Sequence, residues 1–247
     1  MQGPMVWSSD SKLAASVSNA GGLGIMGLGF CPPDLFEAEI RAAKSRTEAP
    51  FGLNLITCLP DAGRLLEITL RENVNVVELE TFPDYFHTLP AYTKALQSNG
   101  TVVIGKVASV EEAKVYEAAG VDFVAVKGCD GGGHIFGFTG TFTLIPQVVD
   151  AVSIPVINSS GVADGRGVAA SLMLGAAGVE VGSRFLLAEE CPIHLNYKNA
   201  IIAGKEGDTI LTGVMAGDGV RGIQNHLTHE MQRIERDFPP AEAAKNS

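Results

Sequence analysis

One glycine-rich segment that ends in a histidine has the residue types needed for acid/base chemistry. Residues 127–134 read Lys-Gly-Cys-Asp-Gly-Gly-Gly-His and follow an apolar run at residues 123–126. Consecutive glycines let a backbone pass close to a ring system, because no side chain intervenes. A histidine can exchange a proton near neutral pH. We therefore predict that His134 is the acid/base residue, with a structural histidine as the alternative. A nucleophile pair of Cys129 and His134 is disfavoured, because closeness along a loop sets no geometry.

Two further glycine-containing segments have the composition of a phosphate site. Residues 155–165 read Pro-Val-Ile-Asn-Ser-Ser-Gly-Val-Ala-Asp-Gly, and residues 179–184 read Val-Glu-Val-Gly-Ser-Arg. Loops that follow consecutive parallel strands lie side by side in a barrel, where backbone N–H groups can bind a phosphate. The two segments predict such a site, with ordinary strand-to-helix turns as the alternative.

Polar residues also stand at or near the ends of other apolar runs. Asn54, Glu80 and Lys106 are the clearest cases. In a barrel of parallel strands, residues at these ends face the functional site. Capping or solvation is a fair alternative for Glu80 and Lys106.

The string Gly-Leu-Gly-Ile-Met-Gly at residues 22–27 matches the glycine pattern of dinucleotide-binding folds. That pattern needs a strand before it and a helix that opens at its third glycine. Here a helical pattern precedes it, and Pro32 and Pro33 delay the next helix. A tight helix-to-strand turn is the better interpretation.

The elements that must position these residues alternate along the chain. Apolar runs lie at residues 23–27, 51–55, 74–79, 101–107, 123–126, 154–157 and 179–181. Helical patterns lie near residues 10–20, 33–45, 61–73, 87–98, 109–119, 142–151 and 164–174, and Ser109 with Glu112 suggests a capping box. This alternation predicts parallel strands covered by helices.

Seven strands are visible, whereas a closed barrel has eight. Only residues 1–5 remain for the missing one, so we predict a TIM (β/α)8 barrel with a shortened first strand; an open sheet is the alternative. The barrel is assigned to residues 1–190. A C-terminal helical extension at residues 191–238 follows, with helices at 192–204 and about 219–237, and then a flexible tail at 239–247.

The composition excludes several classes of protein. The chain has 247 residues, 46% of them hydrophobic, and a formal net charge of -10. Disorder is therefore not expected, and neither is a general affinity for nucleic acid or anionic membranes. Four scattered cysteines, no apparent signal peptide and no membrane span predict a reduced, cytoplasmic protein without a metal site.

Several segments together resemble the nitronate monooxygenase / enoyl-ACP reductase II family. They are residues 2–5, 13–24, 50–54, 131–134, 154–157, 163–167 and 181–185, and the match runs in register from Gln2 to about Glu235. The resemblance implies an FMN-binding TIM barrel with His134 as the catalytic histidine. It implies cofactor contacts at Met5, Asn54, Lys106, Asp130, Gly132, Gly133, Ser160, Gly161, Gly182 and Ser183.

These positions divide by their implied roles. Met5 and Asn54 match contacts near the flavin ring and ribityl chain, Lys106 matches a flavin-side residue, and Gly132 and Gly133 match the segment that passes the cofactor. Gly161, Gly182 and Ser183 match the phosphate cradle. Four residues depart from the usual pattern: Asp130 replaces glutamate, Gly131 replaces alanine, Ser160 replaces glycine, and Ser183 replaces threonine.

The family has two branches. One uses NADH to reduce FMN and passes hydride to an enoyl thioester; the other oxidises nitronates with molecular oxygen. Residues 5–7, 134–135, 144–152, 196–198 and 220–228 look more like the reductase branch. A flavin-binding module without turnover and a cofactor-free isomerase or aldolase for a sugar phosphate are further alternatives. A shortened barrel would expose apolar edges, so a homodimer is also plausible.

Overall fold

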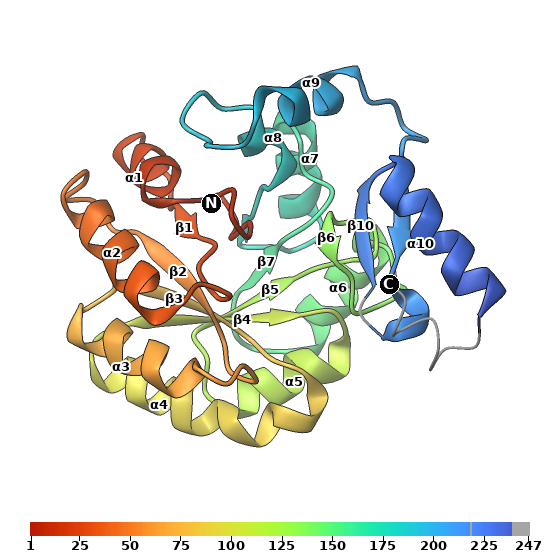
Figure 1. Cartoon of the computed structure of the whole chain (residues 1–247). Helices are drawn as coiled ribbons and strands as arrows, with labels where there is room; N and C mark the ends of the chain where they lie inside the picture. The colour runs from red at the N-terminus through yellow and green to blue at the C-terminus, as the bar shows by residue number, and fades with distance from the viewer. Residues whose placement is uncertain (218, 239–247) are drawn as a thin grey trace.

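A computed structural model describes residues 1–217 and 219–238 and shows a barrel of parallel strands with helices outside (Figure 1). Seven strands form one sheet in the order β1-β2-β3-β4-β5-β7-β8. They are β1 (Ile25–Met26), β2 (Gly52–Ile56), β3 (Val76–Glu80), β4 (Val102–Val107), β5 (Phe123–Val126), β7 (Val156–Asn158) and β8 (Gly178–Val179). All neighbouring pairs in this sheet are parallel.

The N-terminal residues close the barrel. Gln2 forms parallel bridges with Gly24 on one side and with Val181 on the other. Its N–H donates to the carbonyl of Leu23 at 2.9 Å, and Val181 N–H donates to the carbonyl of Met1 at 3.0 Å. Gln2 is fully buried. The predicted (β/α)8 barrel with a shortened first strand is therefore confirmed.

The helices outside the barrel follow the predicted order. They are α1 (Ser11–Asn19), α2 (Pro33–Lys44), α3 (Ala62–Arg71), α4 (Leu89–Ser98), α5 (Val110–Ala118), α6 (Thr141–Ala151) and α7 (Gly165–Met173), with a 3-10 helix η1 (Pro83–Thr88) before α4. Their apolar sides bury large side chains such as Phe36, Leu96 and Tyr116 against the sheet. At the start of α5, Ser109 Oγ accepts from Glu112 N–H as predicted. The Glu112 carboxylate accepts from Ala108 N–H instead of closing the capping box.

Inside the barrel, side chains are arranged in layers because successive strand residues alternate between inside and outside. The lower layer is a small apolar cluster of Val76, Ile104, Ala125 and Ile157. Two residues further along each of these strands, the next inward position is polar. These positions are Glu78, Lys106, Lys127 and Ser159. The apolar layer thus supports a polar layer nearer the C-terminal mouth.

The glycines at residues 22–27 form the tight helix-to-strand turn that the sequence favours. Gly21 adopts a φ of 85° after Ala20, the C-cap of α1, and Gly24 lies against the backbone of Ala14. Any Cβ at position 24 would overlap Ala14 backbone atoms. The glycines here serve helix–strand packing.

Replacing Gly24 by alanine should therefore destabilise the fold. We expect a loss of about 1–3 kcal/mol, because backbone atoms cannot move aside cheaply. The matched control is Gly63→Ala in α3, where a Cβ meets nothing within 4 Å. Urea unfolding followed by circular dichroism measures both variants. Equal stability of the two would contradict the packing described for Gly24.

The C-terminal extension contains a β-hairpin that the sequence analysis missed. The helix α9 (Leu195–Ala203) lies within the predicted range, but β9 (Thr209–Thr212) and β10 (Val220–Ile223) pair antiparallel. β10 also pairs with β6 (Gly133–His134), giving the sheet order β6-β10-β9. The predicted start of the last helix near residue 219 is wrong, because Asn225 caps α10 (His226–Asp237). The predicted tail at 239–247 lies outside the described residues.

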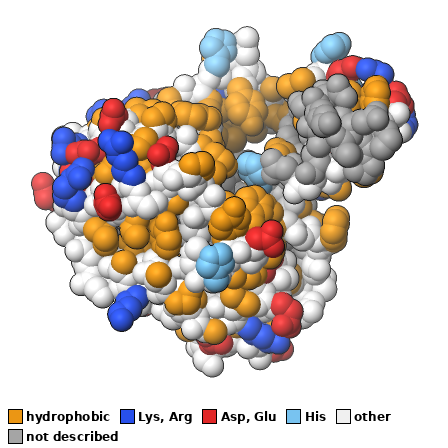
Figure 2. Space-filling model, turned by 60° about the horizontal axis from the view of Figure 1, so that its bottom comes forward, with side chains coloured by type: hydrophobic (Ala, Val, Ile, Leu, Met, Phe, Trp, Pro, Cys, Tyr) orange, Lys and Arg blue, Asp and Glu red, His pale blue; other side chains and the backbone are white. Residues whose placement is uncertain are grey.

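Apolar side chains gather on one face of the molecule (Figure 2). Figure 2 shows one face, where hydrophobic side chains gather around the centre and charged ones lie mostly toward the margins. Exposed apolar residues include Phe142, Met173 and Ile202. A homodimer remains a prediction. No helix in the described residues has the length and apolar character needed to cross a bilayer.

Candidate active site

His134 stands at the rim of the barrel mouth on β6. Its strand is held in place by β10, where Val220 is its partner in register. The imidazole ring stacks against Phe30 and against Phe136, with ring centroids 6.2 Å away in both cases. Two aromatic rings and a strand pairing fix the orientation of the histidine. The ring is partly buried, which leaves part of it open to solvent at the rim.

Several predicted cofactor residues from separate segments lie close together near this rim. A Cβ placed on Gly132 would lie 3.9 Å from Ser183 Oγ, and one on Gly182 would lie 3.8 Å from Met5 Sδ. The glycine loop after β5 therefore lies close to the segment after β8. That segment in turn lies close to Met5, which precedes α1. Gly133 has a φ of 75°, a conformation that favours glycine.

The backbone around Gly161 and Gly182 fits a phosphate group. Gly182 precedes the short helix α8 (Ser183–Leu186), and Gly161 has a φ of 71°. Within the described part of the chain, the N–H groups of Gly161, Gly182 and Ser183 have no hydrogen-bond partner. Exposed N–H groups of this kind bind phosphate oxygens. The FMN phosphate is therefore compatible with the donors present.

Three other predicted cofactor residues already hold loops in place. Ser160 Oγ accepts from Gly128 N–H at 2.8 Å, and Asp130 Oδ1 accepts from Thr141 N–H at 3.0 Å. Asn54 Oδ1 accepts from Gly29 N–H at 2.8 Å. Through these contacts the side chains position the glycine loop and the loop after β1. A direct contact of any of them with a flavin stays a prediction.

Lys106 lies in a buried charged cluster beneath the mouth. Its Nζ is 2.9 Å from Glu78 Oε1 and 2.6 Å from Glu180 Oε1. It also donates to Ser159 Oγ at 2.7 Å, and that hydroxyl donates to Glu180 Oε1 at 2.6 Å. The charge of Lys106 is thus compensated from within the barrel.

The three charged groups shift one another's pKa values. Burial works against a charge on Lys106, but Glu180 and Glu78 outweigh it and raise the pKa of the ammonium. Burial and the neighbouring Glu180 raise the pKa of Glu78 well above its ordinary value. Burial also acts on Glu180, but Lys106 and hydrogen bonds from Glu78, Lys106 and Ser159 lower its pKa. Burial and Glu180 therefore favour the protonated form of Glu78, whereas its contact with Lys106 acts the other way.

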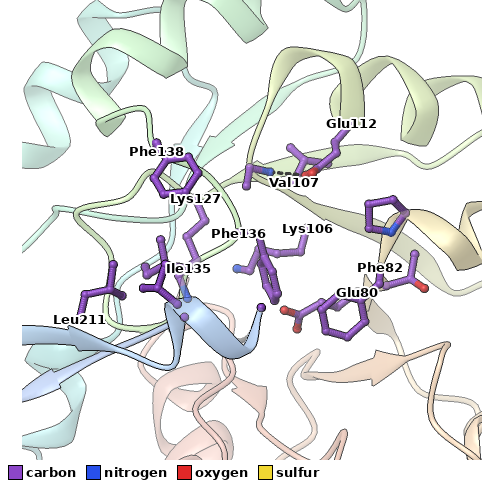
Figure 3. Close-up of a pocket in the computed structure, with 16 residues that line it drawn as sticks. Glu80, Phe82, Lys106, Val107, Glu112, Lys127, Ile135, Phe136, Phe138 and Leu211 are labelled. Atoms are coloured by element: carbon purple, nitrogen blue, oxygen red, sulfur yellow. Dashed lines mark hydrogen bonds between the residues drawn. The ribbon is translucent and has the colours of Figure 1, made fainter. Parts of the chain in front are cut away.

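A cavity of about 280 Å³ opens beside this cluster at the ends of β3, β4 and β5 (Figure 3). Lys127 lines it together with Lys106, Glu80 and several apolar and aromatic side chains. Lys106 is shared with the predicted cofactor set, whereas the other predicted cofactor residues lie outside the lining. The cavity and the backbone predicted to bind a phosphate are therefore different parts of the site.

Sequence analysis missed the roles of Glu78, Glu180 and Lys127. Glu78 interrupts an apolar strand, and Lys127 follows one, so a charge at an inward position was the available signal. Period-two alternation from Val76 and Ala125 would have placed both inside the barrel. The contact of Lys106 with Glu180 depends on barrel closure and has no local signal.

Comparisons with known proteins agree with this fold. The sequence model of the nitronate monooxygenase family matches residues 1–246. Probable nitronate monooxygenases of Staphylococcus saprophyticus and Staphylococcus haemolyticus are 33% and 34% identical to this chain, over 97% of it and 79% of each relative.

Solved structures give the same result. FabK from Thermotoga maritima superposes with a TM-score of 0.92 at 38% identity, covering 99% of this chain and 76% of that one. Nitroalkane oxidase from Streptomyces ansochromogenes superposes with a TM-score of 0.84 at 28% identity, covering 93% and 77%. Fold and relatives define an oxidoreductase built on a (β/α)8 barrel. The chain belongs to the nitronate monooxygenase family, whose members are FMN-dependent.

Proposed function

We propose that this protein binds FMN at the barrel mouth and passes hydride from NADH to an enoyl thioester. The observation that carries the proposal is the convergence of Met5, Gly132, Gly182 and Ser183 beside backbone N–H groups that fit a phosphate. The similarity to FabK supports the reductase branch.

Each group of residues has a part in this proposal. FMN, when bound, supplies the acceptance and donation of hydride. The N–H groups of Gly161, Gly182 and Ser183 bind its phosphate, and Gly132 and Gly133 allow close approach of the backbone. His134, fixed by its aromatic neighbours, orients the substrate and donates a proton to it from the imidazole ring.

A second candidate is oxidation of alkyl nitronates with molecular oxygen. The curated relatives carry the name probable nitronate monooxygenase, and Lys127 places a cation in the cavity, which suits an anionic substrate. Turnover of crotonyl-CoA with NADH and turnover of ethylnitronate with oxygen are the two assays that separate these candidates.

The Gly182→Val variant tests the phosphate cradle. The valine methyl groups would project where we place the phosphate, so the Kd for FMN should rise by about tenfold or more. The matched control is Gly207→Val, at an exposed glycine with nothing within 4 Å of a Cβ. FMN fluorescence titration measures both affinities. If Gly182→Val binds FMN as tightly as the control, the phosphate lies elsewhere.

A further inference from the structure

The cavity at the ends of β3, β4 and β5 has mostly apolar walls and a charged floor. Phe82, Phe136, Phe138, Val107 and Leu211 contribute to the walls. Figure 3 shows the side chains of Lys106 and Lys127 reaching toward the cavity, which Phe136 also lines. Phe82 and Phe136 pack edge to face, with centroids 5.5 Å apart. A volume of about 280 Å³ is near the lower end for small-molecule sites, so it fits a compact group.

The two lysines on the floor differ in the charge they can offer to a ligand. Lys106 is compensated by Glu78 and Glu180. Within the described residues, Lys127 Nζ has no hydrogen-bond or ion-pair partner. Lys127 runs under the glycine loop, with its Nζ 3.7 Å from the position of a Cβ on Gly133. It is the cation that the described lining leaves available to a ligand.

The surroundings of Lys127 lower the pKa of its ammonium group toward neutral pH. Burial, followed by repulsion from Lys106, lowers the pKa of Lys127 to about 8, although Glu80, Glu180 and Glu78 act in the opposite direction. Glu112 also lines the cavity, and its carboxylate accepts from Ala108 N–H. Asp130, on the same loop as Lys127, is held by Thr141. At pH 7 most Lys127 side chains are therefore protonated, and above pH 8 most are neutral.

We propose that this cavity is the substrate site and that Lys127 binds the negatively charged oxygen of the substrate. The proposal deepens the function above and rests on it. The shared ligand chemistry is a planar conjugated group with one charged oxygen and a short apolar tail. A nitronate carries that charge from the start. In an enoyl thioester, hydride adds to the β-carbon and the C=C electron pair shifts toward the carbonyl, so that the oxygen becomes an enolate. A proton from His134 then forms the α-C–H bond, and the carbonyl forms again.

The first test is equilibrium binding of sodium hexanoate, an unreactive anion with an apolar tail. Isothermal titration calorimetry of the full chain, with and without FMN, measures its Kd. The Lys127→Met variant should weaken hexanoate binding by about tenfold or more, which is the loss of one charge-assisted contact. The control variant Lys114→Met, at an exposed lysine on α5, should bind as the unchanged protein does. Neutral hexanamide should be insensitive to either substitution.

The pH dependence provides an independent readout. Hexanoate affinity of the unchanged protein should fall as the pH rises through about 8, since Lys127 loses its proton there. The Lys127→Met variant should show no such fall. Hexanoate binding that is equally tight in the variant overturns the proposal. So does a result in which Lys127→Met alters the flavin potential but not hexanoate binding, because Lys127 then faces the cofactor.

Kinetics distinguish the two sources of the charged oxygen. With a nitronate, the charge is present in the ground state, so Lys127→Met should raise KM. With an enoyl thioester, the charge develops only in the transition state, so the variant should lower kcat. A raised KM for the nitronate or a lowered kcat for the enoyl thioester supports binding of the charged oxygen by Lys127. Unchanged kcat and KM for both substrates overturn it. A chain that binds hexanoate through Lys127 but does not bind FMN would contradict the proposed function and leave the anion site standing.

Discussion

The His134→Asn variant is expected to lower kcat by about 10²–10⁴-fold, the range for loss of a positioned acid/base group. His134 lies on β6 at the rim, with its ring between Phe30 and Phe136. Asparagine retains hydrogen-bonding capacity but cannot exchange a proton near neutral pH. FMN affinity should stay unchanged, because the N–H groups that we propose for its phosphate belong to other segments. Steady-state kinetics with NADH and crotonyl-CoA, together with FMN titration, measure both quantities.

A matched variant serves as the control for general effects of losing a histidine. His229→Asn removes an exposed imidazole from α10 and should retain full activity. If His134→Asn keeps the kcat of the unchanged protein, the histidine is structural, as the alternative interpretation of the sequence holds. If it loses FMN as well as activity, its role is in cofactor binding.

The second large effect is expected from Lys106→Met, which leaves Glu180 and Glu78 buried without their cation. Removing one partner of a buried ion pair costs about 3–5 kcal/mol. Lys106 is almost completely buried, with two carboxylates within 3 Å of its Nζ. Urea unfolding at pH 7 measures the loss. The control Lys114→Met removes an exposed ion pair with Glu111 and should cost less than about 1 kcal/mol.

The pH dependence of this loss has a definite sign. Lys106 lowers the folded-state pKa of Glu180 to about 2, so the stabilisation is present above the ordinary pKa of a glutamate and fades as the pH falls toward 2. The difference between the two proteins should therefore shrink in acid. If Lys106→Met does not fold, the double variant Lys106→Met with Glu180→Gln should recover stability. A single variant as stable as the control would refute the buried cluster.

Much of the fold could be predicted from the sequence because its signals are local. Apolar runs and helical patterns gave strand and helix positions within a few residues, and Pro33 and Ser109 marked helix starts. The start of the last helix was wrong because Val220–Ile223 pairs with β6, almost 90 residues earlier in the chain. No local pattern reports such a pairing. A first strand within residues 1–5 was inferred from the strand count alone, and the structure closes the barrel there through Gln2.

The candidate site was predictable only in part, for a similar reason. The glycine segments and His134 stand out by composition, and the structure brings Gly132 and Ser183 together. Lys106 was expected beside the flavin, and its place among Glu78, Glu180 and Ser159 follows from strands that meet in the barrel interior. Lys127 belongs to no motif. It is available to bind a ligand because the carboxylates of Glu78 and Glu180 pair with Lys106.

The most direct test of the proposed function is anaerobic reduction of the FMN-loaded protein by NADH, followed through the visible absorbance of the flavin. Rapid bleaching by NADH, and recovery of the colour on adding crotonyl-CoA, is the result predicted for an enoyl thioester reductase. A flavin that NADH leaves coloured, but that ethylnitronate bleaches, would contradict hydride transfer from NADH and establish nitronate oxidation in its place. A bound flavin that neither compound reduces would contradict both reactions and leave a flavin-binding module.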